Sequence, residues 1–187
     1  MESKRIFIGI PVKVNLKTVV EMIQTTVDAP YGDVKWVYGK NLHLTLAFIG
    51  NVDESQLKLI SSELESINLG QPFNAVLSYT GLFPNSENPN VFWLGIDKGK
   101  DRLISIVDQI QGILKKLDLP IDEKEFIPHV TIGRVRKSKE IWNIGTNSYL
   151  NAVFSPTRFL VDSIHLYESE MTEKGVKYTT IVSNSLQ

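Results

Sequence analysis

Two short segments of this sequence carry the side chains best suited to chemistry. His43-Leu44-Thr45-Leu46 and His129-Val130-Thr131-Ile132 share the pattern His-x-Thr followed by an apolar residue, at positions 43 and 129. Each imidazole can donate or accept a proton near neutral pH, because the ordinary pKa of histidine is about 6.5. Each threonine adds a hydroxyl that can donate a hydrogen bond to an anion. A pair of histidines with neighbouring hydroxyls is suited to acid–base catalysis of phosphoryl transfer.

The spacing inside each segment predicts that histidine and threonine share one face of a strand, because side chains alternate across a strand. Four apolar residues of the first segment are predicted on the opposite face, toward helices: Leu42, Leu44, Leu46 and Phe48. We therefore predict one cleft in which His43 and His129 are the paired general acid and base. Thr45 and Thr131 are predicted to hold the phosphate.

A second match between the two halves indicates a duplication. Ile8-Gly9-Ile10 and Leu94-Gly95-Ile96 lie at the same offset as the two His-x-Thr segments. In each half a strand, an amphipathic helix and a second strand follow one another. We interpret this as a duplicated unit related by a pseudo-twofold axis, with coincidence as the alternative. Residues 1–187 are predicted to form a single domain of two intertwined lobes.

Hydrophobic periodicity predicts the elements that carry these residues. Strands are predicted at 5–12, 35–38, 42–49, 73–83, 91–97 and 126–135, and a final strand pair at 158–167 and 177–182. Helices are predicted along the apolar positions from Leu16 to Val27, after an N-cap at Asp53, and over 101–117. The segment 138–151 is ambiguous. The pattern as a whole predicts an α+β fold.

Composition limits the class of protein. Hydrophobic residues make up 42% and charged residues 22% of the chain, as in ordinary globular proteins, and there is no cysteine to form a disulfide or a thiolate metal site. A net charge of −1 argues against an extended interface with a long nucleic acid, which needs an excess of positive charge. No apolar run approaches the roughly 20 residues of a membrane helix. The expected compartment is the cytoplasm.

The ordered set of motifs resembles the 2H phosphoesterase superfamily, and within it the RNA 2′,3′-cyclic phosphodiesterases, also called 2′-5′ RNA ligases. The resemblance covers nearly the whole chain and rests on the segments 5–10, 34–37, 41–50, 91–95, 126–135 and 166–170. It implies a bilobal α+β fold, with two antiparallel sheets lining a central cleft and helices on the outside.

The resemblance also implies the chemistry. A 2′,3′-cyclic phosphate on an RNA end or a small nucleotide would be hydrolysed to a 2′-phosphate, without a metal or other cofactor. His43 would be the acid that protonates the 3′ oxygen, and His129 the base that activates water. Arg134 corresponds to a family arginine near the phosphate, although strict alternation would place it on the helix face unless a bulge intervenes. Phe48 is interpreted as a core residue by its parity.

Other residues are weaker candidates for chemistry. His165 lies outside both motifs and is interpreted as a partly exposed strand residue, with a third catalytic or metal role as the alternative. Trp36 and Trp93 are predicted in the core, whereas Trp142 is the best candidate for an exposed base-stacking residue. The basic residues at 134–139 are either a solvated loop or a contact for an RNA end.

Three other functions remain open from the sequence. The same residues could catalyse the reverse reaction, 2′-5′ ligation of RNA. A non-catalytic module that binds nucleotides or RNA ends would keep the histidines for binding alone, and a metal-dependent hydrolase would lose activity with a chelator. The two lobes favour a self-sufficient monomer.

Overall fold

The computed structural model describes residues 3–29, 33–136, 145–173 and 175–187. The strands are β1 (Lys4–Pro11), β2 (Val34–Trp36), β3 (His43–Val52), β4 (Phe73–Phe83), β5 (Val91–Ile96), β6 (His129–Val135), β7 (Thr157–Val161), β8 (Ser163–Thr172) and β9 (Gly175–Ser185). The helices are α1 (Lys17–Gln24), α2 (Glu54–Ser66), α3 (Lys100–Lys116) and α4 (Asn147–Leu150), with a 3₁₀ turn at Gly39–Asn41. The predicted α+β class is confirmed.

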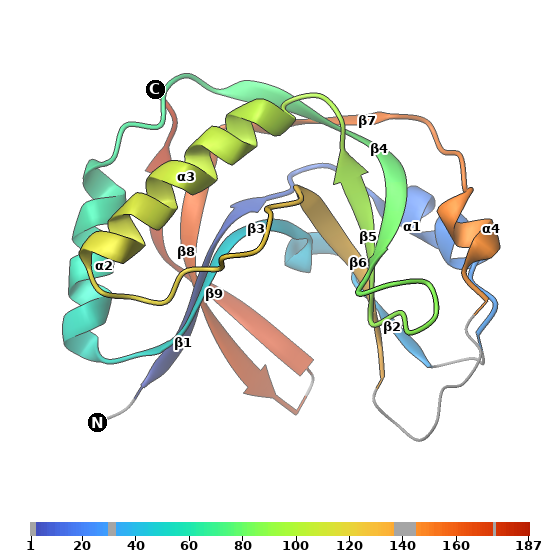
Figure 1. Cartoon of the computed structure of the whole chain (residues 1–187), viewed down its shortest axis with the longest axis horizontal. Helices are drawn as coiled ribbons and strands as arrows, with labels where there is room; N and C mark the ends of the chain where they lie inside the picture. The colour runs from blue at the N-terminus through green and yellow to red at the C-terminus, as the bar shows by residue number, and fades with distance from the viewer. Residues whose placement is uncertain (1–2, 30–32, 137–144, 174) are drawn as a thin grey trace.

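The described strands form one curled antiparallel sheet in the order β7-β4-β5-β6-β3-β1-β8-β9, and β2 pairs with β6. The two sheets expected from the sequence correspond to the two halves of this sheet, β7-β4-β5-β6 and β3-β1-β8-β9. They meet where β3 pairs with β6 at Leu44 and Val130. Figure 1 shows α2 and α3 at one side of the molecule and α1 and α4 at the other, while the β8–β9 hairpin extends away from the helices.

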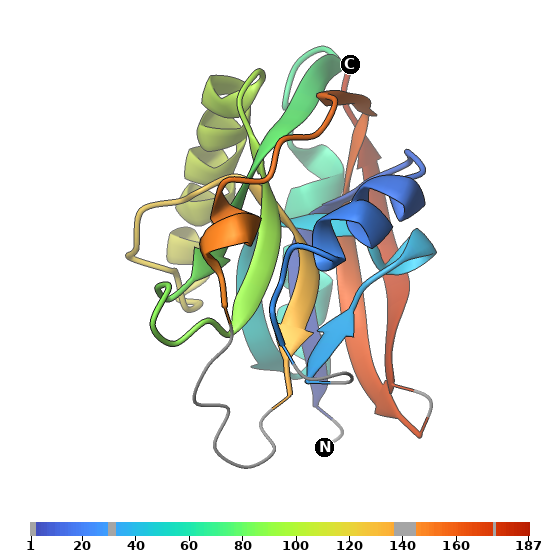
Figure 2. The same ribbon diagram turned by 90° about the vertical axis from the view of Figure 1, so that its right-hand side faces the viewer.

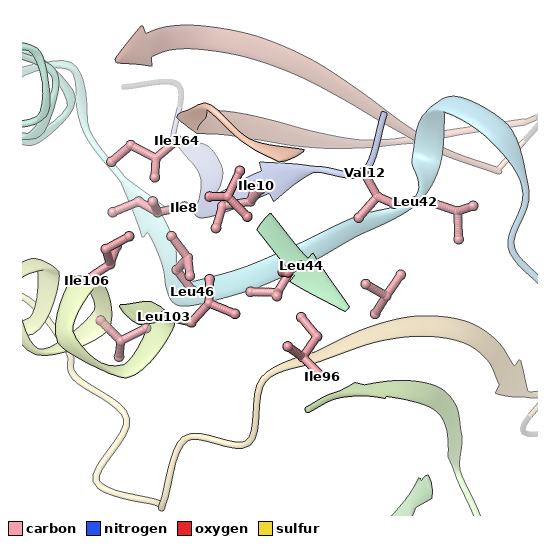
Figure 3. Close-up of a cluster of buried hydrophobic side chains, with 14 of the residues drawn as sticks. Ile8, Ile10, Val12, Leu42, Leu44, Leu46, Ile96, Leu103, Ile106 and Ile164 are labelled. Carbon is pink, nitrogen blue, oxygen red and sulfur yellow. The ribbon is translucent and has the colours of Figure 1, made fainter. Parts of the chain in front are cut away.

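The core lies between the convex face of the sheet and the helices. Alternate side chains of β1 and β3, among them Ile8, Ile10 and Leu44, are buried together with the apolar stripe of α3. In Figure 3, Leu46 of β3 lies beside Leu103 and Ile106 of α3. This burial fixes which face of β3 points to the helices, because a shift of one residue would exchange its two faces.

Helix α2 begins where the sequence predicted. The Asp53 side chain accepts a hydrogen bond from the Gln56 amide at 2.9 Å, and the Gln56 side chain accepts one from the Asp53 amide at 3.1 Å. This reciprocal capping box satisfies two amides that the first turn leaves free.

Figure 2 shows α1 on the side of the molecule away from α3.

The C-terminal strands differ from the prediction. The single strand expected at 158–167 is two strands, β7 and β8, separated at Asp162. β7 pairs with β4 at one edge of the sheet, whereas β8 pairs with β1 and β9 near the other. Apolar residues on both sides of the break hide it from a reading of periodicity. Of the ambiguous segment 138–151, α4 is described, and 138–144, which include Trp142, lie outside the described residues.

The chain order strand–helix–strand–helix occurs twice, as β1-α1-β3-α2 and β5-α3-β6-α4, with β2 inserted in the first copy. The glycine match used to detect this repeat is not a structural equivalence. Gly95 lies opposite His129, whereas the residue opposite His43 is Pro11 and Gly9 lies opposite Thr45. The ladders contain bulges at different places, so equal offsets in sequence do not give equal positions. The division into two lobes stays a prediction.

Candidate active site

Both motif histidines make the same kind of hydrogen bond to a backbone carbonyl. Nδ1 of His43 lies 2.8 Å from the carbonyl oxygen of Asn41, and Nδ1 of His129 lies 2.7 Å from that of Ile127. A carbonyl oxygen can only accept, so Nδ1 carries the hydrogen in each ring. Nε2 is then the nitrogen that can take up a proton. Each acceptor lies two residues before its histidine, just ahead of the strand, so the hydrogen bond fixes the orientation of the ring.

The junction of β3 and β6 brings the two motifs side by side. Leu44 and Val130 are register partners in this antiparallel pair. Continued by one residue on each side, the register sets His43 opposite Thr131 and Thr45 opposite His129, on the face away from the helices. Each histidine is therefore a cross-strand neighbour of the other motif's threonine. The structure thus brings the two motifs together at one place in the sheet.

Aromatic rings surround His43. The ring of Phe7 on β1 lies 4.9 Å from the imidazole centroid, and that of Tyr178 on β9 also lies at 4.9 Å, edge-on at 78°. Phe7 in turn stacks on Tyr167 of β8 at 5.0 Å. These contacts restrict the imidazole and remove water from the sides that the rings cover.

His129 has an equivalent setting from other strands. The ring of Phe83 on β4 meets it edge-on at 5.1 Å, and Trp93 on β5 lies at 5.6 Å. Trp93 is 7% exposed, as predicted for a core residue. Its ring occupies the space beside Gly81, where an added Cβ would lie 2.1 Å from it. The glycine thereby lets the indole reach the histidine.

The electrostatic setting lowers the pKa of both histidines. Burial is the largest cause in each, because it disfavours the charged imidazolium. The hydrogen bond to the backbone carbonyl raises each pKa and so opposes the effect of burial. The positive charge of Arg134 lowers the pKa of both rings further. The charge of His129 also lowers the pKa of His43, which places the two rings within electrostatic reach. Both pKa values therefore lie below the ordinary value of about 6.5, and both imidazoles are mainly neutral at pH 7.

Two adjoining cavities open at His43. The larger has a volume of about 380 Å³ and the smaller about 180 Å³. Both are lined by His43, Arg134, Val176 and Tyr178. The larger continues along Arg5, Phe7 and Phe48, and the smaller along Lys35, Trp36 and Thr131. A group bound at His43 and Arg134 would therefore have space on two sides.

A bulge in the ladder places Arg134 in the cleft. The register between β5 and β6 shifts between Phe92 and Trp93, so that Thr131 pairs with Trp93 and Gly133 with Phe92. Ile132 is passed over, and Arg134 consequently points to the same side as Thr131. This is the irregularity that its predicted position required. The guanidinium lines both cavities beside His43.

Phe48 is also displaced by a bulge, and its prediction as a core residue is wrong. It is 58% exposed, lies 5.9 Å from the ring of Phe7 and lines the larger cavity. The ladder between β1 and β3 shifts twice, between Ile8 and Gly9 and between Ile6 and Phe7. Parity is reversed between these two shifts, where Phe48 lies, and Ile49 is buried there instead.

Comparison with known proteins identifies the family. Residues 16–173 match the family described as the 2′-5′ RNA ligase superfamily. The chain belongs to this superfamily. The RNA 2′,3′-cyclic phosphodiesterase of Aquifex aeolicus is 30% identical over 184 residues, covering 97% of this chain and 96% of its own. The protein of the same name from Thermotoga maritima is 32% identical, covering 95% and 92%.

Two solved structures share the fold. The protein TT0787 of Thermus thermophilus is 26% identical with a TM-score of 0.76, covering 97% of each chain. Escherichia coli LigT, crystallised with 3′-AMP, is 23% identical with a TM-score of 0.76, covering 100% of this chain and 99% of its own. The resemblance inferred from the sequence motifs is thus confirmed at the level of family and fold.

The remaining candidates lie at or beyond the edge of the cleft at His43. Thr45 is half-buried and, like the half-buried His129, lines neither of the two cavities in the described part of the chain. Trp36 is half-buried, packs on Phe92 and lines the smaller cavity. His165 is half-buried on β8, where Ser163 and Ser183 contact its Nε2 at 3.2 Å.

Reasoning from sequence missed Arg5, Phe7 and Tyr178, which line the larger cavity at His43. Arg5 and Phe7 alternate with the buried Ile6 and Ile8, so their parity could have placed them in the cleft. Tyr178 gave no signal, because its position depends on the register of β9 after a shift between Leu166 and Tyr167.

Within residues 3–29, 33–136, 145–173 and 175–187, no three His, Asp or Glu side chains are grouped so that they could hold a metal ion. The described part of the chain likewise has no helix whose length and apolar character would let it cross a membrane.

Proposed function

We propose that this protein hydrolyses 2′,3′-cyclic phosphates, on RNA ends or on small nucleotides, to 2′-phosphates without a metal. The observation that carries the proposal is the pair of imidazoles at the β3–β6 junction, each anchored through Nδ1 to a carbonyl two residues earlier. The names of the relatives from Aquifex aeolicus and Thermotoga maritima support the substrate class. The protein is proposed to act as a monomer, since one chain supplies both histidines.

The proposed reaction uses the histidines in opposite protonation states. The neutral His129 accepts a proton through Nε2 from water as the water oxygen attacks phosphorus. The bond from phosphorus to the 3′ oxygen breaks, and protonated His43 donates its proton to that oxygen. One water is consumed, one proton moves onto His129 and another leaves His43. Exchange with solvent restores both rings. Positioned acid and base groups contribute roughly 10²–10⁴-fold each.

The substrate itself supplies a reason for His43 to be protonated. In the free protein the pKa of this imidazole is lowered by burial, Arg134 and His129. A bound cyclic phosphate carries a negative charge, which raises the pKa of an adjacent imidazole and opposes that effect. Arg134 and Thr131 line the smaller cavity with His43, and their proposed role is to stabilise the charge that develops on the non-bridging oxygens.

The larger cavity is suited to the nucleoside. The exposed ring of Phe48, supported by Phe7 at 5.9 Å, offers a flat apolar surface on which a base can stack. Stacking is tolerant of base identity, since every base has an aromatic face. A local grip on one nucleotide also fits a chain whose net charge is −1.

The test is hydrolysis of adenosine 2′,3′-cyclic phosphate in excess EDTA, with the products separated by chromatography. We expect adenosine 2′-phosphate from the wild type, and loss of at least roughly 10³-fold in kcat for His43→Ala and for His129→Ala. Arg158→Ala, an exposed change on β7 outside the site, is the control. Full activity of either histidine variant would refute the acid–base pair.

The same assays distinguish the other functions. A binding module would give no turnover in the wild type, although His43→Ala would still weaken binding. Inactivation by EDTA would indicate a metal-dependent hydrolase. Addition of an RNA with a 5′-hydroxyl reports ligation as a longer product with a 2′-5′ linkage.

A further inference from the structure

Arg5 lines the larger cavity, which His43 of the proposed catalytic pair also lines. It is the second residue of β1 and pairs with Asn51 near the end of β3. Ile6 and Ile8 are buried in the core, so Arg5 and Phe7 point to the cleft face. Arg5 lines the larger cavity together with His43 and Arg134.

The larger cavity therefore holds two guanidinium groups. Among the described residues, the ion pairs include neither Arg5 nor Arg134. The positive charges of both lower the pKa of the Tyr178 hydroxyl, against the larger effect of its burial, which raises it. The hydroxyl of Tyr178 is thus within electrostatic reach of both cations. Such a wall attracts anions and is suited to more than one phosphate.

One nucleotide can satisfy both cations. Arg134 serves the 2′,3′-phosphate at His43, as proposed above. A nucleotide within RNA carries a second phosphate on its 5′ oxygen, on the other side of the ribose. The cavity of about 380 Å³ lies within the size range of small-molecule sites and extends from His43 past Phe48 to Arg5. A nucleoside whose base stacks on Phe48 would direct its 5′ oxygen along this wall.

We propose that Arg5 binds the phosphate on the 5′ oxygen of the terminal nucleoside, so that the site prefers an RNA end, or a 5′-phosphorylated nucleotide, to a bare nucleoside 2′,3′-cyclic phosphate. The inference rests on the proposed function for its substrate. Arg5 is a specificity residue here and takes no part in proton transfer. Its planar guanidinium can bind two phosphate oxygens at once, which glutamine cannot reproduce.

The test compares kcat/KM on three substrates: adenosine 2′,3′-cyclic phosphate, the same compound with a 5′-phosphate, and a dinucleotide whose 3′-terminal residue is adenosine 2′,3′-cyclic phosphate. We expect the wild type to prefer both phosphate-bearing substrates by roughly tenfold, the size of one charged hydrogen bond. Arg5→Gln should bring the ratio close to one, whereas Arg158→Gln, on β7, should retain it. A preference for the 5′-monophosphate alone would identify a free nucleotide as the ligand. A preference for both phosphate-bearing substrates would show that Arg5 binds a 5′-phosphate in either form.

A wild-type ratio near one, or a ratio that Arg5→Gln leaves unchanged, would overturn the inference. Binding gives a readout that does not depend on turnover. Calorimetry should show adenosine 2′,5′-bisphosphate binding roughly tenfold more tightly than adenosine 2′-phosphate, and Arg5→Gln should abolish the difference. If this difference is present but no substrate is hydrolysed, the proposed function fails and the 5′-phosphate site stands. If hydrolysis occurs without the difference, the reverse holds.

Discussion

Leu44 and Val130 pair across the single point at which β3 and β6 are joined in the described sheet. Neither side chain takes part in chemistry, since both are buried on the helix face. Their register nevertheless sets the site, because it fixes His43 opposite Thr131 and Thr45 opposite His129. The two hydroxyls are not equivalent, however. Thr131 lines a cavity with His43 and Arg134, whereas Thr45 does not line that cavity.

This asymmetry predicts unequal effects of removing the two hydroxyls. Thr131→Val should lower kcat by about 10²-fold, as loss of one donor to a developing negative charge typically does. Thr45→Val should lower it by less than about tenfold. Steady-state kinetics on adenosine 2′,3′-cyclic phosphate measures both effects.

Serine variants are the matched controls. Thr131→Ser keeps the hydroxyl and should recover most of the activity, which separates hydrogen bonding from packing. The free energy of unfolding should change little in Thr45→Val, Thr131→Val and Thr131→Ser, because both threonines are only partly buried. Equal losses in the two valine variants would contradict the asymmetric site.

Arg134 predicts a shift in the titration of both histidines. Its charge lowers the pKa of His43 and of His129, in addition to the larger effect of burial. Arg134→Gln should therefore raise both pKa values toward the ordinary histidine value of about 6.5. NMR titration of the imidazole carbons in the protein without substrate measures this directly.

Arg136→Gln is the control, because it removes the same charge from a position two residues further along that lies outside both cavities. It should leave both titrations nearly unchanged. Binding of adenosine 2′-phosphate should move the wild-type pKa values in the upward direction, since the ligand is an anion. Histidines that titrate at or above the ordinary value in the free wild type would contradict the buried, cationic setting.

The same pKa shifts predict how stability depends on pH. Burial lowers the pKa of His43, His129 and also His165 in the folded state. Between these lowered values and about 6.5, the unfolded chain binds more protons than the folded chain, so acid favours unfolding. The free energy of unfolding should fall as the pH drops from about 7.5 to about 5.5.

Urea denaturation at several pH values within this window is the measurement. The double variant His43→Gln and His129→Gln should show a shallower decline, because two of the three depressed groups are gone. Carboxylates such as Asp53 and Asp162, whose pKa values are also lowered, lose their contribution only at more acidic pH. A free energy that stays constant across the window would count against the assigned shifts.

Much of the fold was accessible from sequence because alternation and helical spacing report burial. The buried stripe of α3, the N-cap at Asp53 and the faces of His43 and His129 follow from local pattern alone. The repeated order of strands and helices was also detected, although through a glycine pair whose members are not equivalent. Repeated histidines indicated that the two motifs converge, which no single segment could have shown.

The rest depended on events that leave no periodic signal. A bulge reverses parity beyond it, which is why Arg134 and Phe48 could not be placed by alternation. The break between β7 and β8 at Asp162 is hidden by apolar residues on both sides. Tyr178 reaches His43 through the pairing of β9 with β8, a long-range register. Sequence patterns thus identified the pair of histidines better than the cavity wall beside them.

The reassignment of Phe48 predicts a separation of activity from stability. Phe48→Ala should lower kcat/KM by about tenfold, since base–aromatic stacking contributes roughly 1–3 kcal/mol. Because Phe48 is 58% exposed, its unfolding free energy should fall by less than about 1 kcal/mol. Leu46→Ala, two residues earlier at 5% exposure, should instead cost about 2–5 kcal/mol through the cavity it leaves.

Two further variants complete this comparison. Phe48→Trp should retain or improve kcat/KM because an indole also stacks on a base, and Leu160→Ala, an exposed apolar change on β7, should affect neither quantity. Urea denaturation and steady-state kinetics on one set of preparations give both measurements. A loss of stability in Phe48→Ala as large as that in Leu46→Ala would return Phe48 to the core, and the bulge in β3 would no longer account for the cleft wall.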